Sequence, residues 1–293
     1  MLLKFRSMDT FIDIFMDALV DTGKLLPFLF VTYLVMELIE SVAEDKAEAV
    51  VKRAGFFGPV VGALVGAFPQ CGFSAAAATL YAGRVITLGT LFSVFLATSD
   101  EMIPIFIAEQ VDPALLMKVL ACKVVIGMVC GFLVDAVLRL RRKGATHLHI
   151  HELCEKEHCE CGDGPVLSAL KHTIQVTVFI FLVTFALAAV MDLVGEEAIG
   201  SFLSQNQALA VCASGLVGLI PNCAASVVIC ELFLDGTLST GAMMSGLLVG
   251  AGIGLLVLCR ENRRAKSNAF IILLLWLMGV VVGFGFDFFG ISF

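Results

Sequence analysis

Long apolar stretches, separated by short polar segments, make up most of the chain. They cover residues 24–42, 56–82, 86–108, 114–138, 168–191, 206–233, 238–258 and 268–289. A helix needs ~20 apolar residues to cross the hydrocarbon core of a bilayer, so these stretches are long enough to enter a membrane. The pattern predicts an all-α polytopic membrane protein that is embedded in a lipid bilayer.

The composition supports this class and excludes others. Hydrophobic residues make up 59% of the 293 positions and charged residues 15%, a balance that soluble domains rarely reach. The net charge is −7 and no basic stripe is present, so nucleic acid is not expected as a partner. The chain has no glycine-rich phosphate-binding loop, so we expect neither an ATPase nor another enzyme. Transport driven by an ion gradient is the function class that remains.

Two apolar stretches are interrupted by the same pattern of helix-breaking and polar residues. Residues 69–74 read Pro-Gln-Cys-Gly-Phe-Ser, and residues 221–226, which begin 152 positions later, read Pro-Asn-Cys-Ala-Ala-Ser. At the same offset Gly89 matches Gly241 and Ser93 matches Ser245. An internal repeat with paired interruptions is typical of transporters whose binding site is formed by the interrupted segments.

The basic residues indicate how the chain crosses the membrane, because Lys and Arg are enriched in cytoplasmic loops. They cluster at residues 46–53, 84, 139–143 and 260–266. All four clusters fall on one side only if residues 56–82 and 206–233 enter the membrane and turn back. Each half then has three full spans plus one re-entrant helical hairpin, and the halves are inverted repeats. Counting the hairpin arms separately gives ten membrane segments.

The prediction divides the chain into three parts. Residues 1–138 form the first membrane repeat, residues 139–165 a cytoplasmic loop, and residues 166–293 the second membrane repeat. A homodimer is a further expectation, by analogy with ion transporters whose hairpin tips meet inside the membrane.

The two hairpin tips supply the first set of candidate site residues. A tip inside the membrane exposes unpaired backbone groups, which only protein or a water-filled cavity can satisfy. The following helix directs its positive N-terminal end at the tip. Side-chain amides, hydroxyls and thiols add oxygen and sulfur ligands, from Gln70, Cys71, Ser74, Asn222, Cys223 and Ser226. Two tips that meet would form a substrate site, whereas the alternative is that the amides cap helices and the cysteines pack.

A second candidate is the polar segment inside the stretch 86–108. Ser99, Asp100 and Glu101 follow one another there. Carboxylates within a span are costly and usually functional, so they are candidate cation ligands or proton-coupling groups. Lys123 of the next stretch is expected at a similar depth, as a coupling group or as a structural ion-pair partner. The second half has Gly250-Ala251-Gly252 at the equivalent place, which indicates close helix packing.

The third candidate is the polar loop, where imidazole and thiol groups crowd together. They belong to His147, His149, His151, Cys154, His158, Cys159 and Cys161. Such ligands suit Zn(II), Cu(I), Co(II) or Ni(II), and the spacing predicts a flexible cytoplasmic chelating segment. No other cofactor is expected to be required. His172, outside this loop, is expected at a membrane interface.

Taken together, these motifs resemble those of one bacterial family. They are Pro27-Phe28-Leu29-Phe30, Met36-Glu37, residues 69–74, Gly89-Thr90-Leu91, residues 98–102, residues 218–223 and the His/Cys loop. The resemblance is to the ten-transmembrane heavy-metal exporters, whose members are labelled arsenic efflux proteins or manganese transporters. It implies a location in the bacterial inner membrane and export of a metal or metalloid.

The substrate remains open between two main hypotheses. The first is secondary-active export of a divalent transition metal resembling Mn(II), for which Asp100 and Glu101 offer hard oxygen ligands. The manganese preference itself is implied by the family's labels. The alternative is efflux of arsenite or another thiophilic or anionic solute, held by Cys71 and Cys223. A channel also stays open, whereas a thiol oxidoreductase is disfavoured because no Cys-x-x-Cys motif occurs.

Overall fold

The protein is described from a computed structural model. The residues described are 12–34 with gaps, 57–99, 102–141, 165–194, 207–221, 223–262, 264–291 and 293. Throughout these residues the regular elements are α-helices, which confirms the predicted all-α class. The helices are α3 (Gly58–Gly66), α4 (Cys71–Ala82), α5 (Leu88–Ala97), α6 (Met102–Ala108), α7 (Pro113–Arg141), α9 (Pro165–Val194), α11 (Gln207–Gly218), α12 (Cys223–Leu234), α13 (Thr240–Val249), α14 (Gly254–Glu261) and α15 (Ala265–Phe288).

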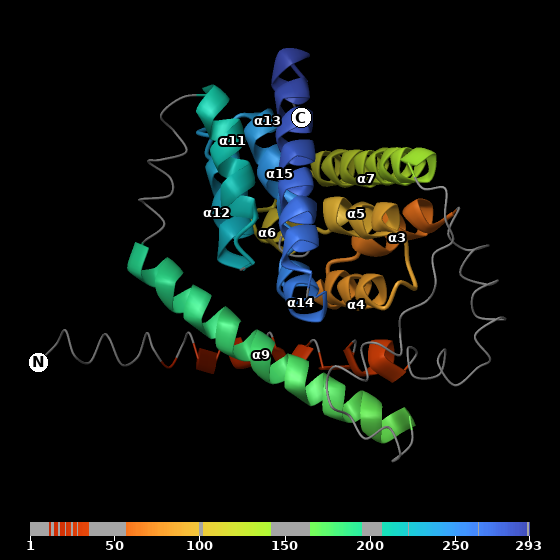
Figure 1. The fold of residues 1–293 in the computed structure, drawn as a ribbon. Helices are drawn as coiled ribbons and strands as arrows, with labels where there is room; N and C mark the ends of the chain where they lie inside the picture. The colour runs from red at the N-terminus through yellow and green to blue at the C-terminus, as the bar shows by residue number, and fades with distance from the viewer. Residues whose placement is uncertain are drawn as a thin grey trace, which may run out of the picture.

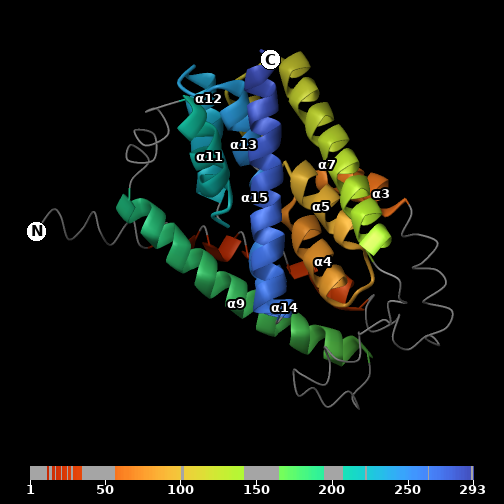
Figure 2. The same cartoon turned by 45° about the horizontal axis from the view of Figure 1, so that its top comes forward.

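The helices form two neighbouring groups. Figure 1 shows α3 to α7 (orange to yellow-green) beside α11 to α15 (cyan to blue), and Figure 2 shows the same neighbours from another side. Helix α9 lies along one side of both groups, next to the helical N-terminal segment (red). Phe15 of that segment contacts Phe181 of α9, with ring centroids 5.4 Å apart.

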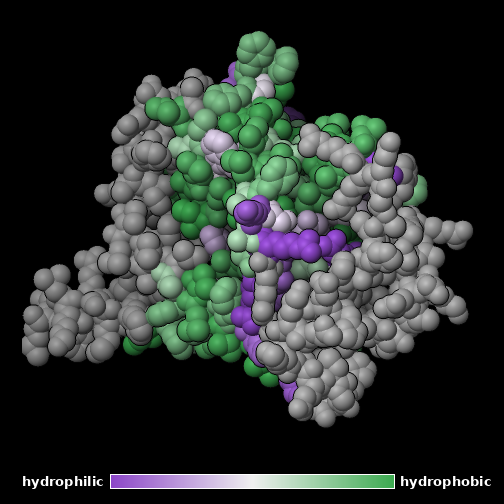
Figure 3. Space-filling view, in the orientation of Figure 1, coloured by the Kyte–Doolittle hydropathy of each residue, from purple (hydrophilic) through white to green (hydrophobic). Residues whose placement is uncertain are grey.

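Several described segments are long and apolar enough to span a bilayer. They are Leu88–Ala108, Pro113–Leu140, Ala169–Ala186, Thr240–Glu261 and Ala265–Phe288. Helices α7 and α15 expose large apolar side chains, including Val129, Leu133 and Leu277, as expected of surfaces that face lipid. Figure 3 shows apolar side chains (green) over much of the described surface. The chain is therefore a multi-pass membrane protein.

The contacts within the first group recur in the second at the offset seen in the sequence. Asp135 of α7 accepts hydrogen bonds at the start of α5, from the Gly89 amide (2.9 Å) and the Thr87 hydroxyl (2.7 Å). At the equivalent place, Asp287 of α15 accepts bonds at the start of α13. They come from the amide of Gly241 and the hydroxyl of Ser239, each at 2.9 Å. Each carboxylate thus caps a neighbouring helix across a packed seam.

The seam depends on glycine. A Cβ atom added at Gly89 would lie 2.2 Å from the carbonyl oxygen of Gly131, and one added at Gly241 would lie 2.3 Å from that of Gly283. Both approaches are too close for a side chain. The two groups therefore share one packing scheme, while their opposite orientation across a membrane stays a prediction.

The predicted spans 86–108 and 238–258 are not continuous helices. The first ends at Ala97 and resumes at Met102, and the second ends at Val249 and resumes at Gly254. Gly250 leaves the helical conformation, with ψ of 76°, and Gly252 has a φ of +51°, a left-handed value that glycine tolerates best. Residues 250–252 were expected to allow close helix packing, and the structure shows that they also break the helix.

Replacing Asp135 or Asp287 by Asn should destabilise the protein. Each change removes the charge from a carboxylate that accepts two hydrogen bonds at a helix N-terminus. We expect the free energy of unfolding to fall by about 1–2 kcal/mol for either variant. Thermal unfolding of the detergent-solubilised protein measures the change. Asp235→Asn at an exposed turn is the control, and a loss as large in this variant would contradict the assigned role of the two caps.

Candidate substrate site at the helix breaks

Ser74 and Ser226, which follow the two predicted tips, lie at the same helix break. Ser74 is buried in the first turn of α4, and a Cβ atom added at Gly254 would lie 2.9 Å from its Cβ atom. Ser226 lies in the first turn of α12, and a Cβ atom added at Gly250 would lie 3.4 Å from its hydroxyl oxygen. Gly250 and Gly254 bound the break between α13 and α14. The structure thus brings one residue from each tip to one place.

The break between α5 and α6 reaches the same centre. Phe95, in the last turn of α5, would meet a Cβ atom added at Gly254 at 2.9 Å. The helices also pack across the two groups, α4 against α14 and α12 against α6. Helix α4, which starts at the first tip, therefore contacts α14, the helix after the break in the second group. Helix α12, which starts at the second tip, contacts α6, the helix after the break in the first group.

Lys123 joins the two breaks. Its side chain comes from the middle of α7 and is only 1% exposed. The ammonium donates hydrogen bonds to the carbonyl oxygen of Thr98 and, at 3.0 Å, to that of Leu247. These carbonyls lie at the ends of α5 and α13, where the helix has no partner for them. One cation therefore stabilises the negative ends of two interrupted helices.

The first tip is described in detail. Gln70 precedes α4 in an extended conformation, with φ of −155°, and its side chain makes no capping hydrogen bond to the helix. Cys71 is half-buried, and its carbonyl accepts a hydrogen bond from the Ser74 hydroxyl at 2.8 Å. The alternative that Gln70 caps the broken helix therefore does not hold for this residue.

Ser99 lies beside the predicted carboxylates. Its side chain is buried, and its hydroxyl donates to the carbonyl oxygen of Ala97 at 2.9 Å. The other predicted ligands lie outside the described residues: Asp100, Glu101, Asn222, His147, His149, His151, Cys154, His158, Cys159 and Cys161. Cys223 begins α12, and its side chain is not described. The roles of all these residues stay predictions.

The described part of the centre can offer two kinds of ligand. Hydroxyl oxygens of serine and backbone carbonyls at helix ends suit hard cations, and the thiol of Cys71 suits soft ones. Helices α4 and α12 begin at this centre, so their positive ends favour negative charge there. Within the described residues, no group of three or more His, Cys, Asp or Glu side chains is placed to hold a metal ion.

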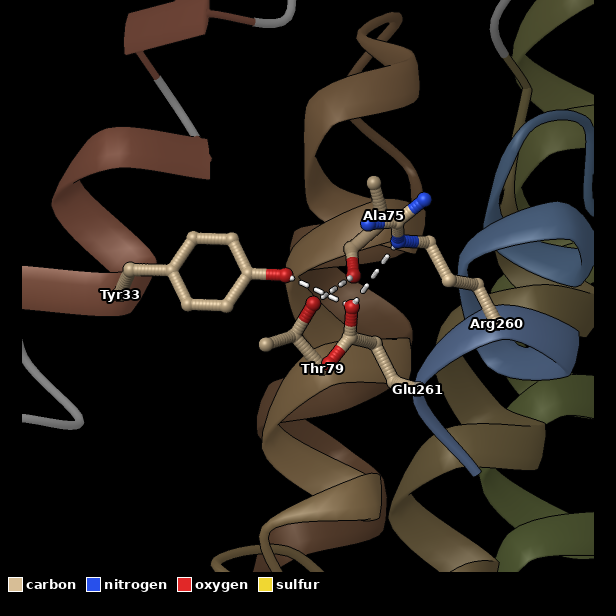
Figure 4. A network of polar contacts seen from close by, with 5 residues as sticks. All are labelled: Tyr33, Ala75, Thr79, Arg260 and Glu261. Atoms are coloured by element: carbon tan, nitrogen blue, oxygen red, sulfur yellow. Dashed lines mark hydrogen bonds and ion pairs between the residues drawn. The ribbon is translucent and has the colours of Figure 1, made fainter. Parts of the chain in front are cut away.

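A second polar cluster was not predicted from the sequence. The Tyr33 hydroxyl donates to Oε1 of Glu261 at 3.0 Å, and Nε of Arg260 lies 3.8 Å from the same oxygen. Figure 4 shows Thr79 of α4 beside this pair. The Tyr33 ring stacks on the imidazole of His172 in α9, with centroids 5.4 Å apart. We call these five residues the Tyr33–Glu261 cluster.

The cluster exposes a limit of the sequence patterns. His172 is only 7% exposed because it packs against Tyr33, and its expected position at a membrane interface stays a prediction. A tyrosine and a glutamate 228 residues apart give no local signal of their pairing. The one available sign was that Glu261 and Arg260 end an apolar stretch.

Replacing Lys123 by Met should destabilise the protein, because the Thr98 and Leu247 carbonyls would lose a buried charged donor. We expect a loss of about 1.5–3 kcal/mol, measured by thermal unfolding in detergent. Lys118→Met, on an exposed position of α7, should change stability by about 0.5 kcal/mol or less. Equal effects of the two changes would contradict the bridging role of Lys123.

One family model matches the chain. Its description is "Putative, 10TM heavy-metal exporter", and it matches residues 6–196. This range contains the first tip, Asp100 and Glu101, Lys123 and the His/Cys loop. No curated protein and no solved structure shows a significant match. Because the family model covers more than half of the chain, the protein belongs to the family of ten-transmembrane heavy-metal exporters.

Proposed function

We propose that the protein is a secondary-active exporter of a divalent transition metal resembling Mn(II), in the bacterial inner membrane. The family gives the coarse function, export of a heavy metal. The observation that carries the central site is the meeting of Ser74 and Ser226 at the helix break that Lys123 joins to the other. The preference for a divalent cation rests instead on the carboxylates of Asp100 and Glu101. A substrate bound there would be held midway between the ends of the long helices.

The proposed architecture is a pair of inverted repeats. Helices α3, α4, α11 and α12 have 9–12 residues each, whereas a full span needs ~20. Arms of this length suit re-entrant hairpins that reach the middle of the bilayer and return. Counted separately, the arms bring the total to ten membrane segments, which agrees with the number in the family's description.

The proposed substrate site combines described and undescribed ligands. Asp100 and Glu101 follow Thr98 and Ser99 directly in the chain, and in this proposal they act at the break that Lys123 holds. Carboxylate and carbonyl oxygens are the ligands that Mn(II) prefers. In this proposal the His/Cys loop binds transition metal on the cytoplasmic side, and Lys123 acts as a coupling or ion-pairing group.

One observation favours the alternative substrate class. Cys71 is a half-buried thiol at the start of α4, where the helix end is positive. Arsenite, or another thiophilic or anionic solute, would be bound by sulfur and by backbone amides at such a place. Lys123 would then contribute to the charge balance of the site.

The exchange of partners between the two halves suggests how transport proceeds. The second arm of each hairpin packs on the opposite half, α4 on α14 and α12 on α6, whereas the first arms α3 and α11 pack on α5 and α13 of their own halves. In our proposal the two tips move as one unit against α7, α15 and the other long helices. That movement exposes the central site to one side of the membrane at a time.

Purified protein in proteoliposomes tests the main proposal. We expect saturable flux of Mn(II), and Asp100→Asn should lower it about tenfold or more, because a charged ligand contributes on the order of 1.5–3 kcal/mol. Asp112→Asn, at an exposed position, is the matched control and should keep normal flux. Mn(II) flux that is equal in the two variants would reject the carboxylate site.

The same proteoliposomes also test the alternative function, efflux of a thiophilic solute. If the protein carries a thiophilic solute, arsenite flux should fall in Cys71→Ser and survive in Asp100→Asn. Cys130→Ser on α7 controls for a general effect of removing a thiol. Zn(II) and Co(II), with a variant lacking residues 146–162, test whether the His/Cys loop affects metal choice. Absence of flux for all four solutes would contradict both candidate functions.

A further inference from the structure

The Tyr33–Glu261 cluster joins three parts of the chain at one buried carboxylate. Tyr33 belongs to the N-terminal helical segment and is 5% exposed, and the Glu261 side chain, at the end of α14, is 6% exposed. His172 and Phe179 come from α9, and the guanidinium carbon of Arg260 lies 5.0 Å from the centre of the Phe179 ring. The cluster therefore attaches both outer helical segments to α14.

The cluster also lies at one end of the helix pair that leads to the candidate substrate site. Ser74 of α4 contacts the start of α14 at Gly254, while Thr79 of α4 lies near Glu261 at the end of α14. The two helices thus run side by side in the same direction. Glu261 lies seven positions after Gly254 in α14, which corresponds to a rise of about 10 Å.

Basic residues mark the side of the membrane on which this end lies. Arg84 follows α4, and Arg264 follows α14. By the positive-inside rule, this end faces the cytoplasm. The cluster is therefore placed between the candidate substrate site and the cytoplasmic surface.

The contacts in the cluster depend on the charge of Glu261. The Tyr33 hydroxyl donates to the carboxylate, and Arg260 lies close enough for an ion pair, so both contacts favour the ionised form. A proton on Glu261 would weaken both. By linkage, any state in which the N-terminal segment has separated from α14 must bind that proton more tightly.

We propose that Glu261 is a proton-binding site whose protonation releases the N-terminal helical segment from α14 and opens the cytoplasmic end of the substrate path. The proposal deepens the exporter function and rests on it. It identifies a proton as the ligand that is exchanged at this end. Acidification favours the released state, and the ionised carboxylate favours the arrangement seen in the structure, in which Tyr33 and Arg260 contact Glu261.

A test must distinguish the effect of Glu261 from the effects of the other titratable and charged groups near it. From the N-terminal segment the titratable group is Tyr33, from α9 it is His172, and from α14 it is the cation Arg260. Helix α4 contributes the neutral hydroxyl of Thr79, which donates to the carbonyl oxygen of Ala75 at 3.2 Å. His172 is the group whose own protonation could imitate that of Glu261, so His172→Gln is included.

The thiol of Cys71 reports on the opening without any substrate. We would treat inside-out membrane vesicles with a membrane-impermeant maleimide and measure the modification rate of Cys71 by mass spectrometry. At pH 8, Glu261→Gln and Tyr33→Phe should each raise this rate about tenfold, since each removes a hydrogen bond to an ionised group. Glu231→Gln and Tyr81→Phe are the matched controls and should react as the wild type does.

The pH dependence of the labelling rate tests whether Glu261 binds the proton. Because the reactivity of a thiol changes with pH, the wild-type rate is divided by the rate of Glu261→Gln at the same pH. Because both contacts favour the ionised carboxylate, and an ordinary glutamate titrates at about pH 4, this ratio should rise from about one tenth at pH 8 toward one only as the pH is lowered toward 4. The same rise should remain in His172→Gln when its rate is compared with that of the double variant.

Several outcomes would overturn the proposal. A ratio that stays constant across the pH range would show that Glu261 does not bind the proton, and loss of the rise in His172→Gln would assign the effect to the imidazole. Equal rates in wild type, Glu261→Gln and Tyr33→Phe would show that the cluster does not close the path. If Glu261→Gln fails to fold, Tyr33→Phe still tests closure, because it removes only the hydroxyl and keeps the ring. If no metal flux is measured but the labelling results hold, the proposed metal substrate is rejected and the role of Glu261 is not.

Discussion

A backbone carbonyl without a hydrogen-bond partner is costly inside a bilayer, and this cost governs the centre of the protein. Helices α5 and α13 both end within apolar stretches, and the last carbonyls of a helix have no partner within the helix itself. The ammonium of Lys123 meets this need at Thr98 and Leu247. A buried ammonium is itself unstable without acceptors, so the lysine and the two helix ends stabilise one another. Irregular backbone can therefore persist at the depth where a substrate would be bound.

The two halves share a scaffold but differ where chemistry is expected. Asp135 and Asp287 occupy equivalent places and make equivalent contacts, so the packing of the long helices is duplicated. The residue equivalent to Lys123 is Leu275, which is completely buried. Among the described residues, the first half thus supplies a cation that reaches both breaks, and the second half has no cation at the equivalent position. A site between the two breaks would have unequal sides, which suits binding a single substrate in one orientation.

The sequence predicted features that leave a local signal. The breaks at residues 67–70 and 219–222 were found because proline and polar side chains interrupt apolar runs. The break at 250–253 was not predicted, since Gly250 and Gly252 are equally compatible with close packing of a continuous helix. The caps formed by Asp135 and Asp287 depend on tertiary contacts between helices, and a lone carboxylate near the end of an apolar run does not reveal its partner. The Tyr33–Glu261 pair joins residues 228 positions apart, so no local pattern in the sequence predicts it.

The helix pair α4 and α14 links the two polar regions of the molecule. At one end the pair is packed through Ser74 and Gly254 with almost no free space, so a shift of α14 would change the break that Lys123 holds. At the other end the pair is attached to the N-terminal segment and α9 through Glu261 and Arg260. A rigid helix of this length transmits displacement from one end to the other with little loss. Loss of one proton-sensitive contact can therefore alter the geometry of the substrate site, because the same short helix carries both.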